Sequence, residues 1–83
     1  MYFVYTILSL KRNWIYVGLT NNVQRRIKEH NQGWNHSTKA YAPFRLLFVE
    51  NYSSRMDARK REKYLKSAAG KRWIRKTLLC GPV

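Results

Sequence analysis

The sequence predicts a small α/β domain of the α+β kind, a three-stranded antiparallel sheet flanked by helices in the order ββαβαα. Two short β-rich runs near the start are separated by a brief, mostly polar connection. A later run, residues 44–52, is almost continuously apolar, and the segments after the second and third runs have capped helical patterns. At 83 residues the chain is long enough for one domain, residues 1–83, and too short for two independently stable units.

The first two strands are predicted over Phe3–Leu8 and Trp14–Leu19. The connection at residues 9–13 is short enough to make them neighbours in an antiparallel hairpin. If the pairing is symmetric about that turn, Tyr5 lies opposite Tyr16. Both phenols are then expected to project from the same face of the hairpin.

A first helix is predicted directly after the hairpin and up to residue 31. Residues 20–22 offer N-caps, and an apolar stripe follows with its members one turn apart. Arg26 and His30 are also one turn apart and flank that stripe. Two phenols, a guanidinium and an imidazole are therefore expected to converge.

The segment from Gln32 to Pro43 mixes turn formers with hydroxyls, cations and aromatic residues. This composition predicts a surface loop. Two interpretations of its aromatic residues are equally open. Trp34 and Tyr41 either contact a binding partner or fold back on the core of an ordinary connection.

The second half of the chain is predicted to hold one more strand and two helices. Phe44–Tyr52 reads as a strand, placed at the centre of the sheet because its apolar run is nearly continuous. Ser53 or Ser54 caps a helix that runs to about Ser67 and presents Ala58, Glu62 and Leu65 on one face. The segment 68–70 interrupts the pattern. A last helix then covers residues 71–79 and ends at Gly81 and Pro82.

Charge is the strongest signal in the composition. The chain has 17 Lys and Arg against 4 Asp and Glu, a formal net charge of +13. Such an excess favours a polyanionic partner, above all nucleic acid, and its self-repulsion favours a monomer. No stretch suits a membrane surface or a span. Cys80 is the sole cysteine, so we expect neither an intrachain disulfide nor a thiolate metal cluster, and a cytoplasmic location.

Several ordered features resemble the GIY-YIG nuclease family over nearly the whole chain. Val4-Tyr5 and the Tyr16-Val17-Gly18 sequence match the two strand motifs, and Arg26 and His30 match the family's first helix. The segment 58–66 resembles the helix that carries an acidic metal ligand, which maps onto Glu62. The likeness is to the small single-domain group related to the nicking module of bacterial excision nuclease.

The resemblance implies a role for each matched residue. Tyr5 or Tyr16 would activate or orient the attacking water, with assistance from His30. Arg26 would hold the scissile phosphate, which suits its fixed fork of donors. Glu62 would hold one Mg²⁺ or Mn²⁺, an ion that needs few protein ligands because it keeps waters and takes phosphate oxygens. Gly18 would let the strand end approach the helix closely.

The implied activity is metal-dependent hydrolysis of a DNA strand in repair or recombination, directed by substrate structure rather than sequence. The cations predicted to contact phosphates are Arg25, Lys39, Arg59 and Lys63. The chain departs from the pattern at Leu19-Thr20, where some relatives have a lysine, and at residues 73–75, where many have an asparagine. The alternatives are a non-catalytic nucleic-acid-binding module on the same fold and a basic structural protein such as a ribosome-associated component.

Overall fold

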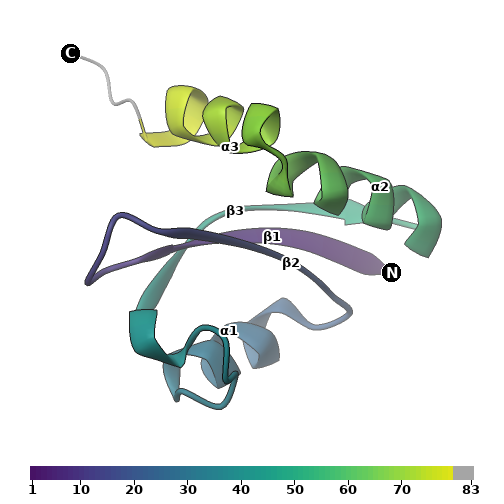
Figure 1. The fold of residues 1–83 in the computed structure, drawn as a ribbon. Helices are drawn as coiled ribbons and strands as arrows, with labels where there is room; N and C mark the ends of the chain where they lie inside the picture. The colour runs from purple at the N-terminus through teal and green to yellow at the C-terminus, as the bar shows by residue number, and fades with distance from the viewer. Residues whose placement is uncertain (80–83) are drawn as a thin grey trace.

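The chain places helices on both faces of one three-stranded sheet, as the computed structural model of residues 1–79 shows (Figure 1). This confirms the predicted α+β class and the order ββαβαα. The predicted helix end at Gly81 and Pro82 lies outside the described residues, as does Cys80. The elements are β1 (Tyr2–Ser9), β2 (Ile15–Thr20), α1 (Val23–Asn31), the 3₁₀ turn η1 (Lys39–Tyr41), β3 (Phe44–Tyr52), α2 (Arg55–Lys66), α3 (Ala68–Ile74) and the π-helical turn η2 (Arg75–Leu79).

The strand order is β2-β1-β3, so the prediction of a central third strand was wrong. β1 is the central strand and is antiparallel to both neighbours. The apolar run of β3 was misleading because it is not buried on both faces. Leu46 and Val49 are exposed on this edge strand. β1, in contrast, has four consecutive buried residues, 4–7.

The predicted pairing of the two tyrosines was also wrong, by two residues. Tyr5 lies opposite Gly18, and Tyr16 lies opposite Ile7. The pairs are centred between Lys11 and Arg12, one residue later than the predicted pairing, because β1 extends to Ser9 and β2 starts only at Ile15. A shift of two residues keeps every side chain on its face. The expectation that both phenols share a face is therefore confirmed, with the rings placed diagonally.

The two faces of the sheet carry separate clusters of apolar side chains. On one face, Val4, Ile15 and Val17 pack with residues of α2 and α3. On the other, Tyr5 and Ile7 pack with α1 and with the segment around η1. α1 therefore covers one face of the sheet, and α2 with α3 covers the opposite face (Figure 1).

Side-chain caps fix the helix starts. Asn22 accepts a hydrogen bond from the Arg25 backbone N–H at the start of α1, and Ser54 accepts one from Asp57 at the start of α2. The boundary between the last two helices differs from the prediction. The chain breaks at Ser67, which is extended and caps α3 through Gly70 N–H, so residues 68–70 form the first turn of α3. No helix within residues 1–79 is long and apolar enough to cross a membrane.

Candidate active site

A buried chain of hydrogen bonds links β1, α1 and the following loop. The Tyr5 hydroxyl lies 2.9 Å from His30 Nε2, and His30 Nδ1 lies 2.8 Å from Thr38 Oγ1. Thr38 Oγ1 donates to the Asn35 carbonyl at 3.5 Å, so it accepts from His30 Nδ1–H. This assignment leaves Nε2 as an acceptor, and the Tyr5 O–H donates to it. The buried imidazole is thus held in one orientation and one tautomer.

Tyr16 completes the aromatic group on this face. Its ring centroid lies 6.3 Å from that of Tyr5 and 5.0 Å from that of His30. Tyr5 is only 1% exposed, whereas Tyr16 is half-buried. The hydroxyl group that solvent and substrate can approach is therefore that of Tyr16.

Gly18 makes room for the Tyr5 ring. A Cβ atom at this position would collide with the Tyr5 hydroxyl oxygen. We expected Gly18 to bring the strand end close to the helix; the atoms nearest to its Cβ position belong to Tyr5, on the adjacent strand. The glycine belongs to the site because a side chain there would displace the phenol from His30.

Burial sets the charge states of the linked pair. It raises the pKa of Tyr5 to about 12, with a further contribution from Tyr16, while the Arg26 guanidinium acts in the opposite direction. Burial, together with the positive charge of Arg26, lowers the pKa of His30 to about 4. At neutral pH the phenol and the imidazole are both uncharged.

Arg26 lies at the border of this group on α1. Its Nη1 donates to Glu29 Oε1 at 2.9 Å, and Arg25 Nε lies 3.9 Å from Glu29 Oε2. The Arg26 side chain is about a third exposed and acts electrostatically on both Tyr5 and His30. It is thus anchored by a carboxylate at one side and remains open to an anion at another.

Glu62 approaches from the opposite face of the sheet, on α2. The residue is 4% exposed, and its two oxygens are paired with Arg59 Nη1 at 2.9 Å and Lys66 Nζ at 3.1 Å. The Lys66 ammonium also lies 5.9 Å from the centroid of the Tyr16 ring. Lys66 therefore connects the carboxylate to the tyrosine group around the β2 edge.

The donor set near Glu62 suits one kind of metal ion. Among residues 1–79 there is no group of three or more His, Cys, Asp or Glu side chains that could hold a metal by themselves. A single, mostly buried carboxylate is a hard oxygen ligand for Mg²⁺ or Mn²⁺, ions that take their remaining ligands from water and phosphate. The residues fit such an ion and do not fit a structural zinc site.

The other acids have separate partners or none. Glu50 is held by Arg61 through both oxygens, at 2.9 and 3.3 Å, and accepts from the Tyr52 hydroxyl. Asp57 is exposed in the first turn of α2. Glu29 is held by Arg26, so Glu62 is the buried carboxylate whose partner, Lys66, also lies near the Tyr16 ring.

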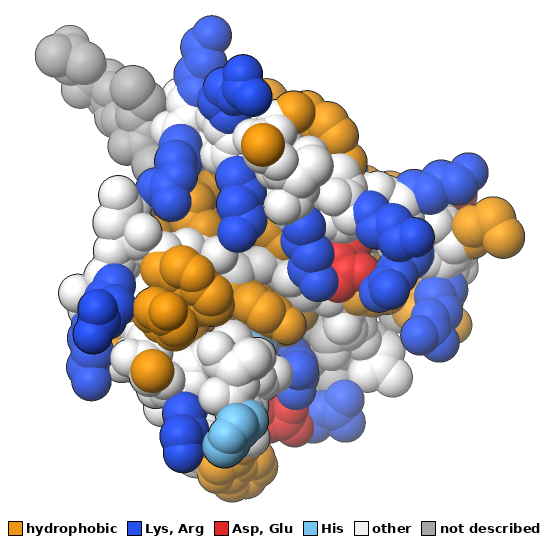
Figure 2. Space-filling model, viewed as in Figure 1, with side chains coloured by type: hydrophobic (Ala, Val, Ile, Leu, Met, Phe, Trp, Pro, Cys, Tyr) orange, Lys and Arg blue, Asp and Glu red, His pale blue; other side chains and the backbone are white. Residues whose placement is uncertain are grey.

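The predicted phosphate contacts are exposed but spread over three elements. Arg25 lies on α1, Lys39 on η1, and Arg59 and Lys63 on α2. Figure 2 shows Lys and Arg side chains gathered over the helices on one face, with few acidic side chains among them. Of the four, Arg59 and Lys63 line the same hollow on α2.

The two aromatic residues of the loop after α1 are placed differently, one against the core and one in solvent. Tyr41 folds back and stacks on Trp14, with ring centroids 4.0 Å apart. Trp34 is 70% exposed. The loop also contributes Thr38, which the sequence analysis missed because nothing in a loop sequence marks a buried hydroxyl. Lys66 was missed too, although its position four residues after Glu62 is a helical pairing signal.

Comparison with known proteins gives a family match over most of the chain. The model of the GIY-YIG catalytic domain matches residues 1–76. A UPF0213 protein of Clostridium perfringens is 39% identical over 67 residues, 80% of this chain and 71% of that protein. The UPF0213 protein YazA of Bacillus subtilis is 33% identical over 72 residues, 86% of this chain and 72% of that protein.

A relative with a shorter match carries a functional name. The structure-specific endonuclease subunit SLX1 homolog of Giardia intestinalis is 43% identical over 51 residues, which cover 57% of this chain and 14% of that protein. No solved structure matches the chain significantly.

Proposed function

The chain belongs to the GIY-YIG nuclease family, and we propose that it is an endonuclease that hydrolyses a phosphodiester bond in DNA with the help of Mg²⁺ or Mn²⁺. One observation carries the proposal. The tyrosine and histidine group, Arg26 and a mostly buried carboxylate meet at the β2 edge, with Lys66 between Tyr16 and Glu62. Phosphodiester hydrolysis needs an oriented water and positive charge around the phosphate, and this arrangement offers both.

We assign the contact with the attacking water to Tyr16. A water molecule must reach the hydroxyl that orients it, and Tyr16 is half-buried while Tyr5 is almost fully enclosed. The phenolic oxygen of Tyr16 would accept a hydrogen bond from that water. Tyr5 would act as a positioning residue that packs beside Tyr16 and is itself fixed by His30.

The charge states support orientation by the buried pair rather than proton transfer. Burial raises the pKa of Tyr5 to about 12 and lowers the pKa of His30 to about 4, so the phenol keeps its proton and the imidazole stays uncharged. In the proposed reaction His30 accepts the Tyr5 hydrogen bond and remains neutral.

Arg26 would bind the scissile phosphate. Its guanidinium can donate to two phosphate oxygens while Glu29 keeps the side chain oriented. Because the group stays charged, it stabilises the additional negative charge of the transition state without a proton transfer.

Glu62 would hold the metal ion. A bound Mg²⁺ or Mn²⁺ would supply positive charge to the phosphate oxygens. Glu62 would exchange its present pairing with Arg59 or Lys66 for the ion, and the released cation would remain beside the phosphate. Arg26 and the released cation would thus both lie near the negatively charged phosphate.

The substrate would be recognised by its shape. Cationic side chains contact phosphates, which position a substrate but carry no sequence information. A role in DNA repair or recombination, in the cytoplasm, belongs to the same proposal. The name of the Giardia relative, a structure-specific endonuclease subunit, supports recognition by structure rather than by sequence.

A cleavage assay tests the proposal. Supercoiled plasmid, duplex, flapped and branched oligonucleotides, and an RNA duplex would be incubated with the protein and Mg²⁺, Mn²⁺ or a chelator. We expect metal-dependent nicking that is strongest on the flapped or branched DNA. Tight binding without cleavage of any substrate at any metal concentration would instead indicate a non-catalytic binding module.

A further inference from the structure

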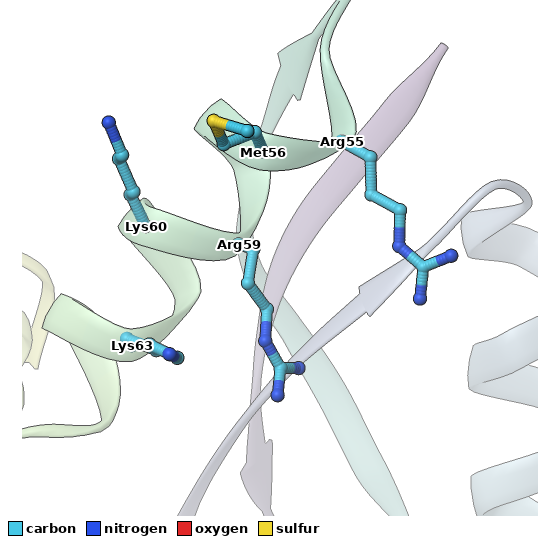
Figure 3. Close-up of a pocket in the computed structure, with 5 residues that line it drawn as sticks. All are labelled: Arg55, Met56, Arg59, Lys60 and Lys63. Carbon is cyan, nitrogen blue, oxygen red and sulfur yellow. The ribbon is translucent and has the colours of Figure 1, made fainter.

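The outer side of α2 has a hollow, and of the residues that line it the proposed reaction involves only Arg59, through its pairing with Glu62. It has a volume of about 710 Å³ and is lined by Arg55, Met56, Arg59, Lys60 and Lys63 (Figure 3). Four of the five lining side chains are cations, and no acidic side chain lines it. Asp57, the acid in the same segment, is not among the lining residues.

The cations form a row along the helix. Arg55, Arg59 and Lys63 are spaced by four residues, which places successive members about 6 Å apart along the axis. Arg55 and Arg59 extend to the same side from successive turns in Figure 3. This spacing is comparable with that of consecutive phosphates along an extended strand.

The row borders the candidate site at its middle member and a second hollow at its first member. Arg59 pairs with Glu62, so the cation in the middle of the row borders the proposed metal ligand. Arg55 also lines a hollow of about 210 Å³ with Tyr2, Leu19, Thr20 and Asn21. A strand whose scissile phosphate lies near Glu62 therefore has a cationic path toward the start of α2.

Met56 gives the hollow a second kind of contact. Its side chain is 69% exposed beside the cations. An exposed thioether is flexible and polarisable and can pack against a flat ring. A strand with unpaired bases can offer such a ring next to its phosphates, whereas the bases of a duplex are covered by stacking.

We propose that the row of cations on α2, from Arg55 to Lys63, binds the backbone of one unpaired strand of the substrate next to the cleaved bond. This inference rests on the proposed function and adds the part of the substrate that lies beyond the scissile phosphate. It names a single strand as the ligand and α2 as the element that selects branched or flapped DNA.

The test is a binding measurement in chelator, in which no cleavage occurs. A labelled single-stranded oligothymidylate is titrated with wild type, with the double variant Arg55→Ala and Lys63→Ala, and with the control Arg72→Ala and Lys76→Ala. Both variants lose one Arg and one Lys, and the control residues are exposed beyond α2. We expect the α2 variant to bind roughly tenfold more weakly. The slope of the logarithm of its binding constant against the logarithm of the salt concentration should decrease in magnitude by roughly 1 to 1.5.

Met56→Ala keeps the charge and tests the contact with bases. It should weaken binding to the oligothymidylate while leaving the affinity for an abasic strand of equal length unchanged. Polyglutamate of the same length serves as a competitor. The inference is wrong if polyglutamate displaces the labelled strand as well as unlabelled oligothymidylate of the same charge does. It is also wrong if the α2 variant and the control variant bind the strand with equal affinity.

The outcomes separate this inference from the proposed function. A protein that cleaves DNA but binds the single strand equally well in both double variants would overturn the inference alone. A protein that never cleaves, yet loses affinity only in the α2 variant, would keep the inference and overturn the nuclease proposal.

Discussion

At the scale of single residues, the buried imidazole of His30 determines the character of the site. It is fully buried, it accepts from Tyr5, and its other nitrogen is held by Thr38. A group in this position orients its neighbours without changing its charge. The pattern of residues predicted that His30 and the phenols meet, but the neutral state follows only from burial, which a sequence does not display.

The first prediction concerns pH and stability. Because the folded-state pKa of His30 is about 4, below the ordinary value of 6.5, the unfolded chain binds a proton that the folded chain does not. Stability should therefore fall as the pH decreases from about 6.5 to about 4, by up to about 3 kcal/mol. Urea unfolding at a series of pH values measures it.

The matched control uses the other histidine. His36 is exposed, so His36→Gln should leave the pH dependence of unfolding unchanged. His30→Gln should remove most of the dependence between pH 4 and 6.5. An equal slope in wild type and His30→Gln would show that His30 is not held neutral.

A second prediction separates the two tyrosines. Tyr5→Phe leaves a buried imidazole nitrogen without its donor and should destabilise the fold by about 1–3 kcal/mol. Tyr16→Phe should leave unfolding within about 0.5 kcal/mol of wild type. It should reduce the nicking rate by about 100-fold or more. Denaturant unfolding and single-turnover nicking on the same preparations measure both, and the reverse pattern would exchange the roles assigned to the phenols.

At the scale of elements, the residue ranges of the strands and helices could be predicted more accurately than the strand order and the pairing register of the sheet. The range of β3 was predicted to the residue, and Ser54 caps α2 as expected. The prediction that β3 is the central strand was wrong. An apolar run shows that a strand can be buried, but it does not show which elements lie beside the strand. The predicted hairpin register was wrong because the turn is centred one residue later than the predicted pairing placed it.

The junction of α2 and α3 gives a third prediction. A Cβ atom on Gly70 would collide with the Tyr64 carbonyl oxygen and lie 2.5 Å from Leu65 Cα. Both are backbone atoms, so Gly70→Ala should separate the helices and destabilise the fold by about 1–3 kcal/mol despite the better helix propensity of alanine. The control is Ala69→Ser, an exposed change in the same turn. Similar thermal unfolding midpoints for the two variants would contradict the close contact.

At the scale of the whole molecule, the distribution of charge matters more than its total. The net charge of +13 predicted a nucleic-acid partner but not where it binds. The fold pairs Glu29, Glu50 and Glu62 with neighbouring cations. A row of cations along α2 remains beside the site. Helical periodicity predicted that Arg59 and Lys63 lie on that helix. Their position beside Glu62 and the site depends on how α2 packs on the sheet, which the sequence pattern does not show.

The most direct test of the central claim compares nicking by two site variants and two matched controls. Supercoiled plasmid and a flapped duplex would be incubated with Mg²⁺ and wild type, Glu62→Ala, Arg26→Ala, Asp57→Ala or Arg72→Ala. Asp57 and Arg72 are exposed residues outside the site and carry the same charges as Glu62 and Arg26, respectively. We predict that Glu62→Ala and Arg26→Ala lose nicking by at least about 100-fold, while both controls retain it. Metal-dependent nicking that persists in either site variant would contradict the assigned site.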